Sequence, residues 1–142
     1  MIDARTAPYA AFTLRLALGA MFIAHALLKV FVFTLPGTVQ FFESLGLPGV
    51  LAYVTIAVEL VGGAMLILGI KTRWVAALLI PVLLGATWTH VPNGWLFTAA
   101  NGGWEYPAFL SVAALAQALL GDGAFALSSA FSAKPAVRLR TA

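Results

Sequence analysis

The chain has 142 residues, and its composition excludes a water-soluble globular protein. Hydrophobic residues make up 62% of it and charged residues only 9%, and the mean hydropathy is +0.99. Because so few polar side chains cannot cover a globule in water, the sequence predicts an integral membrane protein. The net charge of +3 comes from basic residues in separate patches that anionic lipid head groups attract, so no nucleic-acid partner is expected.

Four apolar stretches are each about as long as the hydrocarbon core of a bilayer is thick. They predict membrane-spanning helices over residues 9–33, 50–70, 74–91 and 107–127. Short connections join these stretches, and we therefore expect an all-α fold, an integral membrane antiparallel four-helix bundle. The remaining sequence is too short for a second domain. We predict a single transmembrane domain over residues 1–142, with a basic tail at residues 128–142.

The connection after the first predicted span contains a short amphipathic segment. Residues 38–45 place Phe41, Phe42 and Leu45 on one side at helical spacing, and Gly46 and Pro48 end the pattern. This arrangement is typical of a short helix that lies in the membrane interface.

Lysine and arginine residues lie on one side of the predicted bundle. Residues 34–49 and 92–106 contain neither residue type, although both segments contain a glutamate. Positive residues near helix ends stay on the cytoplasmic side, so both termini are predicted to be cytoplasmic. The residues that carry this prediction are Arg5, Lys71, Arg73, Lys134, Arg138 and Arg140.

A few ionisable side chains lie within the predicted spans, where burial of a charge is costly. With a rise of about 1.5 Å per residue, His25 and Glu59 lie at similar depths, and Lys29 lies one helical turn outward of His25. We predict that Glu59 pairs with Lys29 or with His25. Arg15 lies about 20 Å inward of Lys29, so its guanidinium is expected to extend to the cytoplasmic head groups.

The outer half of the bundle is the predicted functional site. His25, Glu59 and His90, at the outer end of the third span, are the candidate proton-handling groups. The segment 92–107 is rich in turn-forming and aromatic residues and is expected to fold onto the bundle. The candidate binding residues are Lys29, Trp88, Asn101, Trp104 and Glu105.

Several motifs in this order resemble the DoxX family over residues 10–127. They are the run Leu14–Gly19 with His25 and Lys29, the segment Val58–Gly63, His90–Gly94, and Asn101–Pro107. The resemblance implies a small four-helix protein of a bacterial or archaeal cytoplasmic (inner) membrane. It also implies a setting among quinone-linked oxidoreductases, because the family is named from a component associated with a terminal quinol oxidase and a thiosulfate:quinone oxidoreductase.

Two classes of function follow from the residues and the resemblance together. In the first, the protein is a subunit or accessory of a quinone-linked redox system, and redox proteins and quinone are its partners. In the second, it is a non-catalytic membrane protein that acts as a carrier of small solutes or ions or as an assembly factor. Turnover by this chain alone is not expected, because it carries no covalent redox group. Small residues on the second and fourth spans permit a homo-oligomer.

The polar residues also have alternatives to a functional role in proton handling or binding. An ion pair of Glu59 and Lys29 that only fixes helix register is the structural alternative. A haem held by His25 and His90 is not expected, because their predicted depths differ by about 12 Å. The chain has no cysteine and no closely spaced ligand pair, so no metal site and no covalently bound cofactor are predicted.

Overall fold

The computed structural model describes residues 3–128, and helices make up most of this part of the chain. Within residues 3–128 there is no strand, so the all-α prediction is confirmed. The predicted short helix after the first span is also present. Apart from Ser128, the predicted basic tail lies outside the described residues. The elements in chain order are α1 (Ala7–Phe31), α2 (Leu35–Ser44), α3 (Val50–Leu68), α4 (Thr72–His90), the 3-10 turn η1 (Val91–Asn93) and α5 (Glu105–Leu120).

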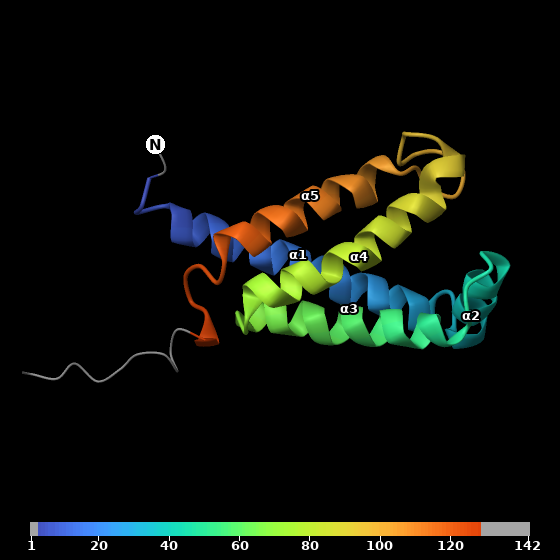
Figure 1. Cartoon of the computed structure of the whole chain (residues 1–142), viewed down its shortest axis with the longest axis horizontal. Coiled ribbons are helices and arrows are strands. Elements are labelled where there is room, and N and C mark those ends of the chain that lie inside the picture. Colours follow the sequence, from blue (N-terminus) through green and yellow to red (C-terminus); the bar gives the residue numbers. More distant parts are fainter. Residues whose placement is uncertain (1–2, 129–142) are drawn as a thin grey trace, which may run out of the picture.

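The helices form two closely packed pairs, α1 with α3 and α4 with α5. The pairs lie together at the end of the molecule that holds the α3–α4 turn, and they spread apart toward the other end (Figure 1). The spread end carries α2 and the loop between η1 and α5. We call it the outer end and the opposite end the inner end.

Two glycines bring α1 and α3 close together. A Cβ atom on Gly19 would lie 2.7 Å from the carbonyl oxygen of Gly63, and a Cβ atom on Gly63 would lie 2.8 Å from the carbonyl oxygen of Gly19. Each glycine therefore faces the backbone of the other helix, a contact that no larger residue permits. The neighbouring Gly62 faces Leu79 of α4 instead. These contacts fix α3 between α1 and α4.

Local sequence signals explain where the helices end. Gly69 ends α3 with φ of 69°, a left-handed conformation that glycine adopts without strain. Lys71 then takes φ of 47°, so the chain reverses within three residues before α4 begins. At the outer end, the Thr34 hydroxyl accepts a hydrogen bond from the Gly37 amide and so caps α2.

The last helix is shorter than predicted. The sequence predicted a span over residues 107–127, but α5 covers Glu105–Leu120. Its length of 16 residues corresponds to about 24 Å. Gly121 and Gly123 both have positive φ values, and the chain turns back at this point although residues 124–127 are apolar. The prediction was wrong here because it followed hydropathy and ignored the Gly-Asp-Gly signal.

Three helical segments within residues 3–128 are long and apolar enough to cross a membrane. They are Ala7–Phe31, Val50–Leu68 and Thr72–Asn93, whereas α5 falls below this length. Many of their large apolar side chains are exposed, among them Phe31, Val61 and Trp74, as expected for surfaces that contact lipid.

The buried core lies at the middle and inner part of the bundle. Leu18 and Phe22 of α1 pack with Leu66 of α3 and Leu79 of α4, and all four side chains are at most 2% exposed. Ala114 supplies the contact from α5. Because every position in this layer is apolar, it separates the polar side chains at the outer end from those at the inner end.

Candidate functional site

A buried ion pair joins α1 to α3 in the outer half of the bundle. The Lys29 ammonium donates hydrogen bonds to both carboxylate oxygens of Glu59, at 2.9 Å to Oε1 and 2.8 Å to Oε2. The side chain of Glu59 is only 6% exposed and that of Lys29 is 19% exposed. We call these two residues the outer ion pair. The predicted pairing of Glu59 is observed, and Lys29 is the partner.

The backbone around the outer ion pair holds it in place. Glu59 lies one helical turn before Gly63, so the close contact of Gly63 with Gly19 presses the carboxylate toward α1. Lys29 lies in the last turn of α1, and its carbonyl oxygen accepts a hydrogen bond of 2.9 Å from the Thr38 hydroxyl of α2. Both ends of the pair are therefore supported by contacts between helices.

His25 lies one turn inward of Lys29 and has a defined tautomer. Its Nδ1 atom lies 2.9 Å from the Met21 carbonyl oxygen. A carbonyl oxygen can only accept, so Nδ1 carries the proton, and Nε2 of the neutral ring is a proton acceptor. The ring also stacks on Tyr106 of α5, with 6.2 Å between the ring centroids.

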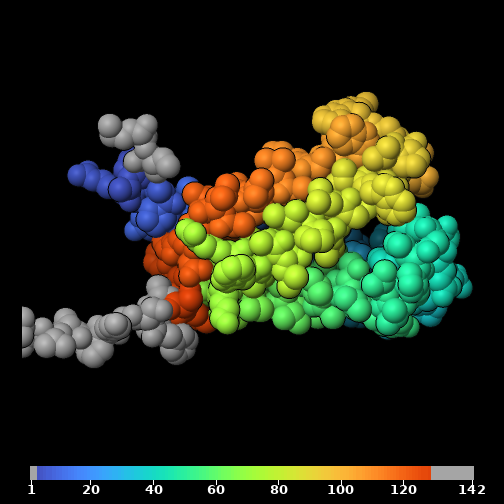
Figure 2. All heavy atoms as spheres, viewed as in Figure 1, coloured from blue at the N-terminus to red at the C-terminus, as the bar shows by residue number. Residues whose placement is uncertain are grey.

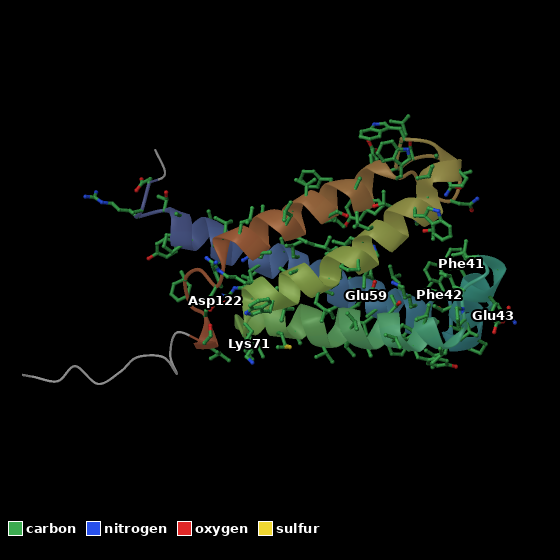
Figure 3. All side chains as sticks on the ribbon, in the orientation of Figure 1. Phe41, Phe42, Glu43, Glu59, Lys71 and Asp122 are labelled. Carbon is green, nitrogen blue, oxygen red and sulfur yellow. The ribbon has the colours of Figure 1, made fainter. Side chains whose placement is uncertain are left out.

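The outer ion pair lies where the two helix pairs diverge. Glu59 is placed at the point where α4 leaves α3 (Figure 3). A space-filling view shows a hollow between α4 and the end of the molecule that carries α2, with α1 behind it (Figure 2). The charged groups are thus buried among side chains but lie near an opening between the helices.

The structure does not bring His90 or Glu105 to the outer ion pair. His90 Nδ1 donates to the Ala86 carbonyl oxygen at 2.7 Å, and its ring lies against Gly102 of the outer loop. Glu105 Oε1 accepts a hydrogen bond of 2.8 Å from the Phe97 amide. These hydrogen bonds stay within the turn of α4 and the outer loop, so proton handling by His90 and binding by Glu105 stay predictions.

The other predicted binding residues belong to the outer loop or to the surface. Trp104 packs edge-to-face on Trp95 with 4.4 Å between the ring centroids. The Asn101 carbonyl oxygen accepts from the Asn93 side chain at 3.2 Å, and Trp88 is 57% exposed. These contacts organise the loop itself, and a role in binding stays a prediction.

An open groove runs along the outer part of α5. Its volume is about 540 Å³, and it is almost entirely apolar. Tyr106 is part of its wall and also stacks on His25, so one side chain connects the groove to the vicinity of the outer ion pair. The lining residues are Trp95, Phe97, Glu105, Tyr106, Ala108, Phe109 and Val112.

Arg15 does not extend to the head groups as predicted. Its side chain is completely buried at the inner end, and its Nη2 atom donates to the Ala124 carbonyl oxygen at 3.0 Å. The prediction failed because residues 121–128 fold back beneath the bundle and cover the guanidinium. A Cβ atom on Gly69 would lie within bonding distance of Arg15 Nη1, so the glycine also provides the space that Arg15 occupies.

Asp122 organises the inner end. Its Oδ1 atom accepts from the Thr72 amide at 3.0 Å at the start of α4, and Oδ2 accepts from the Ser128 hydroxyl. Burial alone would raise the pKa of Asp122, but the hydrogen bonds from Ser128 and Thr72 and the nearby charge of Arg15 outweigh burial and lower it. Asp122 therefore remains a carboxylate at neutral pH. We call Arg15, Thr72, Gln117 and Asp122 the inner cluster.

Sequence reasoning missed most of the inner cluster. Thr72, Gln117 and Asp122 were not singled out, although Gln117 and Thr72 are both 0% exposed. One signal was available for Asp122, because an aspartate between two glycines directly after an apolar run is typical of a turn. Nothing in the local sequence indicates that Gln117 is buried, because a single glutamine in an apolar helix can lie on the core side or on the outer side of the helix.

No metal centre is present in the described part of the chain. Among residues 3–128, no group of three or more histidine, aspartate or glutamate side chains is arranged to hold a metal ion.

Comparisons with known proteins identify relatives of the chain. The DoxX family model matches residues 10–92, which is more than half of the sequence. A protein of Bacillus subtilis (strain 168) named "Putative oxidoreductase CatD" is 44% identical over 73 residues. This match covers 51% of the chain and 53% of the relative, so the similarity extends over about half the length of each protein. No solved structure gave a significant match.

Proposed function

The chain belongs to the DoxX family of membrane proteins, and on that basis we propose that it is a subunit or accessory of a quinone-linked redox system. In this proposal the outer ion pair and His25 bind the quinone head group and handle its protons. The observation that carries the proposal is the buried contact of Lys29 with both oxygens of Glu59, next to His25 and near an opening between the helices. The name of the Bacillus subtilis relative, "Putative oxidoreductase CatD", agrees with a redox setting.

The residues present fit the head group of a quinone. Such a head group is a planar ring with carbonyl oxygens, and it needs hydrogen-bond donors and an apolar wall. The Lys29 ammonium is a donor, the Nε2 atom of His25 is the ring atom left for exchange of a proton, and Tyr106 offers an aromatic face. The apolar groove beside Tyr106 suits an isoprenoid tail.

Each group has a separate chemical role in this proposal. A bound quinone would supply the two-electron chemistry, which the chain itself lacks. Lys29 would orient a carbonyl oxygen and stabilise negative charge on it. His25 would exchange a proton through Nε2, because Nδ1 is held by the Met21 carbonyl oxygen. Glu59 would hold Lys29 in position through the two hydrogen bonds between them.

The carrier alternative requires a polar path from one end of the bundle to the other. The described residues between the outer ion pair and the inner cluster are apolar, with Leu18, Phe22, Leu66 and Leu79 at most 2% exposed. A closed apolar layer of this kind favours a site that is reached from the outer end or from the lipid.

The same proposal includes a position in the membrane. We propose that α1, α3 and α4 cross a bacterial or archaeal inner membrane and that α5, although short, is the fourth span. The inner end would face the cytoplasm, because Arg5, Lys71 and Arg73 lie at that end. The chain would act as one domain with redox proteins as partners, and a homo-oligomer is compatible with this placement.

The test is to measure quinones that co-purify with the protein. We expect mass spectrometry to find quinone with the wild-type protein and at least tenfold less with Lys29→Met. Glu43→Gln is the matched control, because Glu43 is an exposed acid of α2. Absence of quinone from the wild-type protein in membranes that contain it, or equal amounts in all three proteins, would contradict the proposal.

A further inference from the structure

Several buried polar atoms at the inner end have no hydrogen-bond partner in the described part of the chain. They are Nε and Nη1 of Arg15, Oγ1 of Thr72 and Oε1 of Gln117. The three side chains are each 0% exposed, so bulk water does not reach these atoms. A buried polar atom without a hydrogen-bond partner is destabilising, and more so when the group is charged.

These atoms belong to residues of three helices, α1, α4 and α5, and each of these residues hydrogen-bonds to the segment of residues 121–124. Asp122 accepts from the Thr72 amide, and its carboxylate is close enough to Arg15 for the two charges to attract each other. Gln117 lies in the last turn of α5, and its Nε2 atom donates to the Gly121 carbonyl oxygen at 2.7 Å, one residue before Asp122. The backbone between Gly121 and Ala124 thus connects all the members of the inner cluster.

The donor and acceptor pattern restricts what can satisfy these atoms. The two Arg15 nitrogens can only donate, the Gln117 oxygen can only accept, and the Thr72 hydroxyl can do either. A bare anion would suit Arg15 but would be repelled by the Gln117 oxygen and by the Asp122 carboxylate. A cation would be repelled by Arg15. A small uncharged molecule that both donates and accepts fits all the atoms.

We propose that the inner cluster is a binding site for ordered water, which bridges the free Arg15 nitrogens to Gln117 and Thr72 beneath the fold of residues 121–128. Water accepts from the guanidinium and donates to the amide oxygen, and buried waters in proteins typically make about three such bonds. The guanidinium, which contacts the Ala124 carbonyl oxygen and the Phe12 ring and lies in the field of Asp122, would gain further hydrogen-bond acceptors from this water.

This site differs from the proposed quinone site in position and in chemistry. The apolar layer of Leu18, Phe22, Leu66 and Leu79 lies between them. We therefore expect this water to exchange with water on the cytoplasmic side, past residues 121–128. It would not exchange through the hollow between α4 and the end of the molecule that carries α2. The proposal holds or fails independently of quinone binding.

The first test is a structure of the full chain in lipid nanodiscs at a resolution that shows ordered water. We expect density at about 2.7–3.2 Å from an Arg15 nitrogen and from Gln117 Oε1 or Thr72 Oγ1. Direct bonds from both free nitrogens to Asp122, or to residues 129–142, would overturn the proposal. A bromide ion bound at Arg15 after a bromide soak would also overturn it, because it would show an anion site.

The second test is a double-mutant cycle on the melting temperature. If water links the two side chains, Gln117→Met should lower the melting temperature at least twice as much in the wild-type protein as in the Arg15→Met variant. Ser111→Ala on α5 is the control, and its effect should be the same in both backgrounds. Equal effects of Gln117→Met in the two backgrounds would overturn the proposal. Should Arg15→Met fail to fold, Thr72→Val replaces it with the same expectation.

Discussion

The two buried polar sites of this molecule, at opposite ends of α1, satisfy their charges in different ways. In the outer ion pair, Lys29 and Glu59 contact each other directly through two hydrogen bonds. In the inner cluster, Arg15 and Asp122 attract each other without a contact of ion-pair length among the described residues, and Arg15 bonds to the Ala124 carbonyl oxygen. The outer site is built by two helices, whereas the inner site needs the folded-back residues 121–128.

This difference shows two ways to keep a charge inside an apolar bundle. Two opposite charges on neighbouring helices can be matched by helix packing alone, here by the contact of Gly19 with Gly63. A buried arginine with no acid on a neighbouring helix requires a covering segment that brings a carbonyl oxygen and a carboxylate to it. The outer site is consequently sensitive to how α1 and α3 pack, and the inner site is sensitive to the segment after α5.

The largest effect is expected when one member of the outer ion pair is removed. Lys29→Met leaves the Glu59 carboxylate buried and unpaired, which should cost about 3–5 kcal/mol of the free energy of unfolding. The double variant Lys29→Met/Glu59→Met removes both charges and should be more stable than the single variant. Unfolding in detergent with a denaturant measures both. A double variant that is less stable than Lys29→Met would show that the two charges do not act as a pair.

The next largest effect concerns the helix contact that supports the outer ion pair. Gly63→Ala places a methyl group 2.8 Å from the Gly19 carbonyl oxygen, so α1 and α3 must separate, at a cost of about 1–3 kcal/mol. Gly85→Ala in α4 is the control, because a Cβ atom there meets no atom within 4 Å. Its stability should stay the same or rise slightly. Equal effects of the two variants in thermal unfolding would contradict the packing argument.

A smaller effect is expected from the charge of Asp122. Asp122→Asn should cost about 1–2 kcal/mol, because hydrogen bonds to a carboxylate are stronger than those to an amide. The folded state lowers the pKa of Asp122, so the carboxylate stabilises the fold above its unfolded pKa of about 3.9 and loses this effect as the pH falls through the lower folded value.

Melting curves over a pH series check this prediction. The difference in melting temperature between the wild-type protein and Asp122→Asn should be constant from about pH 5 to pH 8 and should shrink below about pH 4. Glu43→Gln, an exposed acid of α2, should show no such difference at any pH. A difference that disappears above pH 5 would mean that the inner cluster does not stabilise the carboxylate.

The last prediction concerns the topology in the membrane, and no change in stability is expected. It tests which of the two sites lies at the cytoplasmic end of the bundle. Because the chain has no cysteine, single cysteines at Glu43 and at Lys71 can be labelled without background. These residues lie at opposite ends of the bundle (Figure 3). An impermeant thiol reagent added to intact cells should label Glu43→Cys and not Lys71→Cys. The reverse pattern would place the inner cluster outside the cell.

The sequence was sufficient for most of the helices and for the pairing of Glu59 with a cation of the first span, and it failed at the inner cluster. Equal depth on two adjacent spans was enough to pair Glu59 with a cation, because in an apolar bundle few partners exist. Arg15 was misplaced because its partners, Ala124 and Asp122, were assigned to the end of a helix that stops at Leu120. His90 and Glu105 were predicted for the outer site with Glu59, although their hydrogen-bond partners lie in the same helical turn and in the outer loop.

The sequence by itself determined that this is an apolar helical protein, where most of its helices run, and that Glu59 pairs with a basic side chain of the first span. Those properties follow from hydropathy and helical spacing, which act over a few residues. Only the tertiary structure decided that the chain turns back after Leu120, that Arg15 is covered, and that Tyr106 meets His25. These contacts join residues about 80 to 110 positions apart, and no local periodicity specifies which distant backbone covers a given side chain.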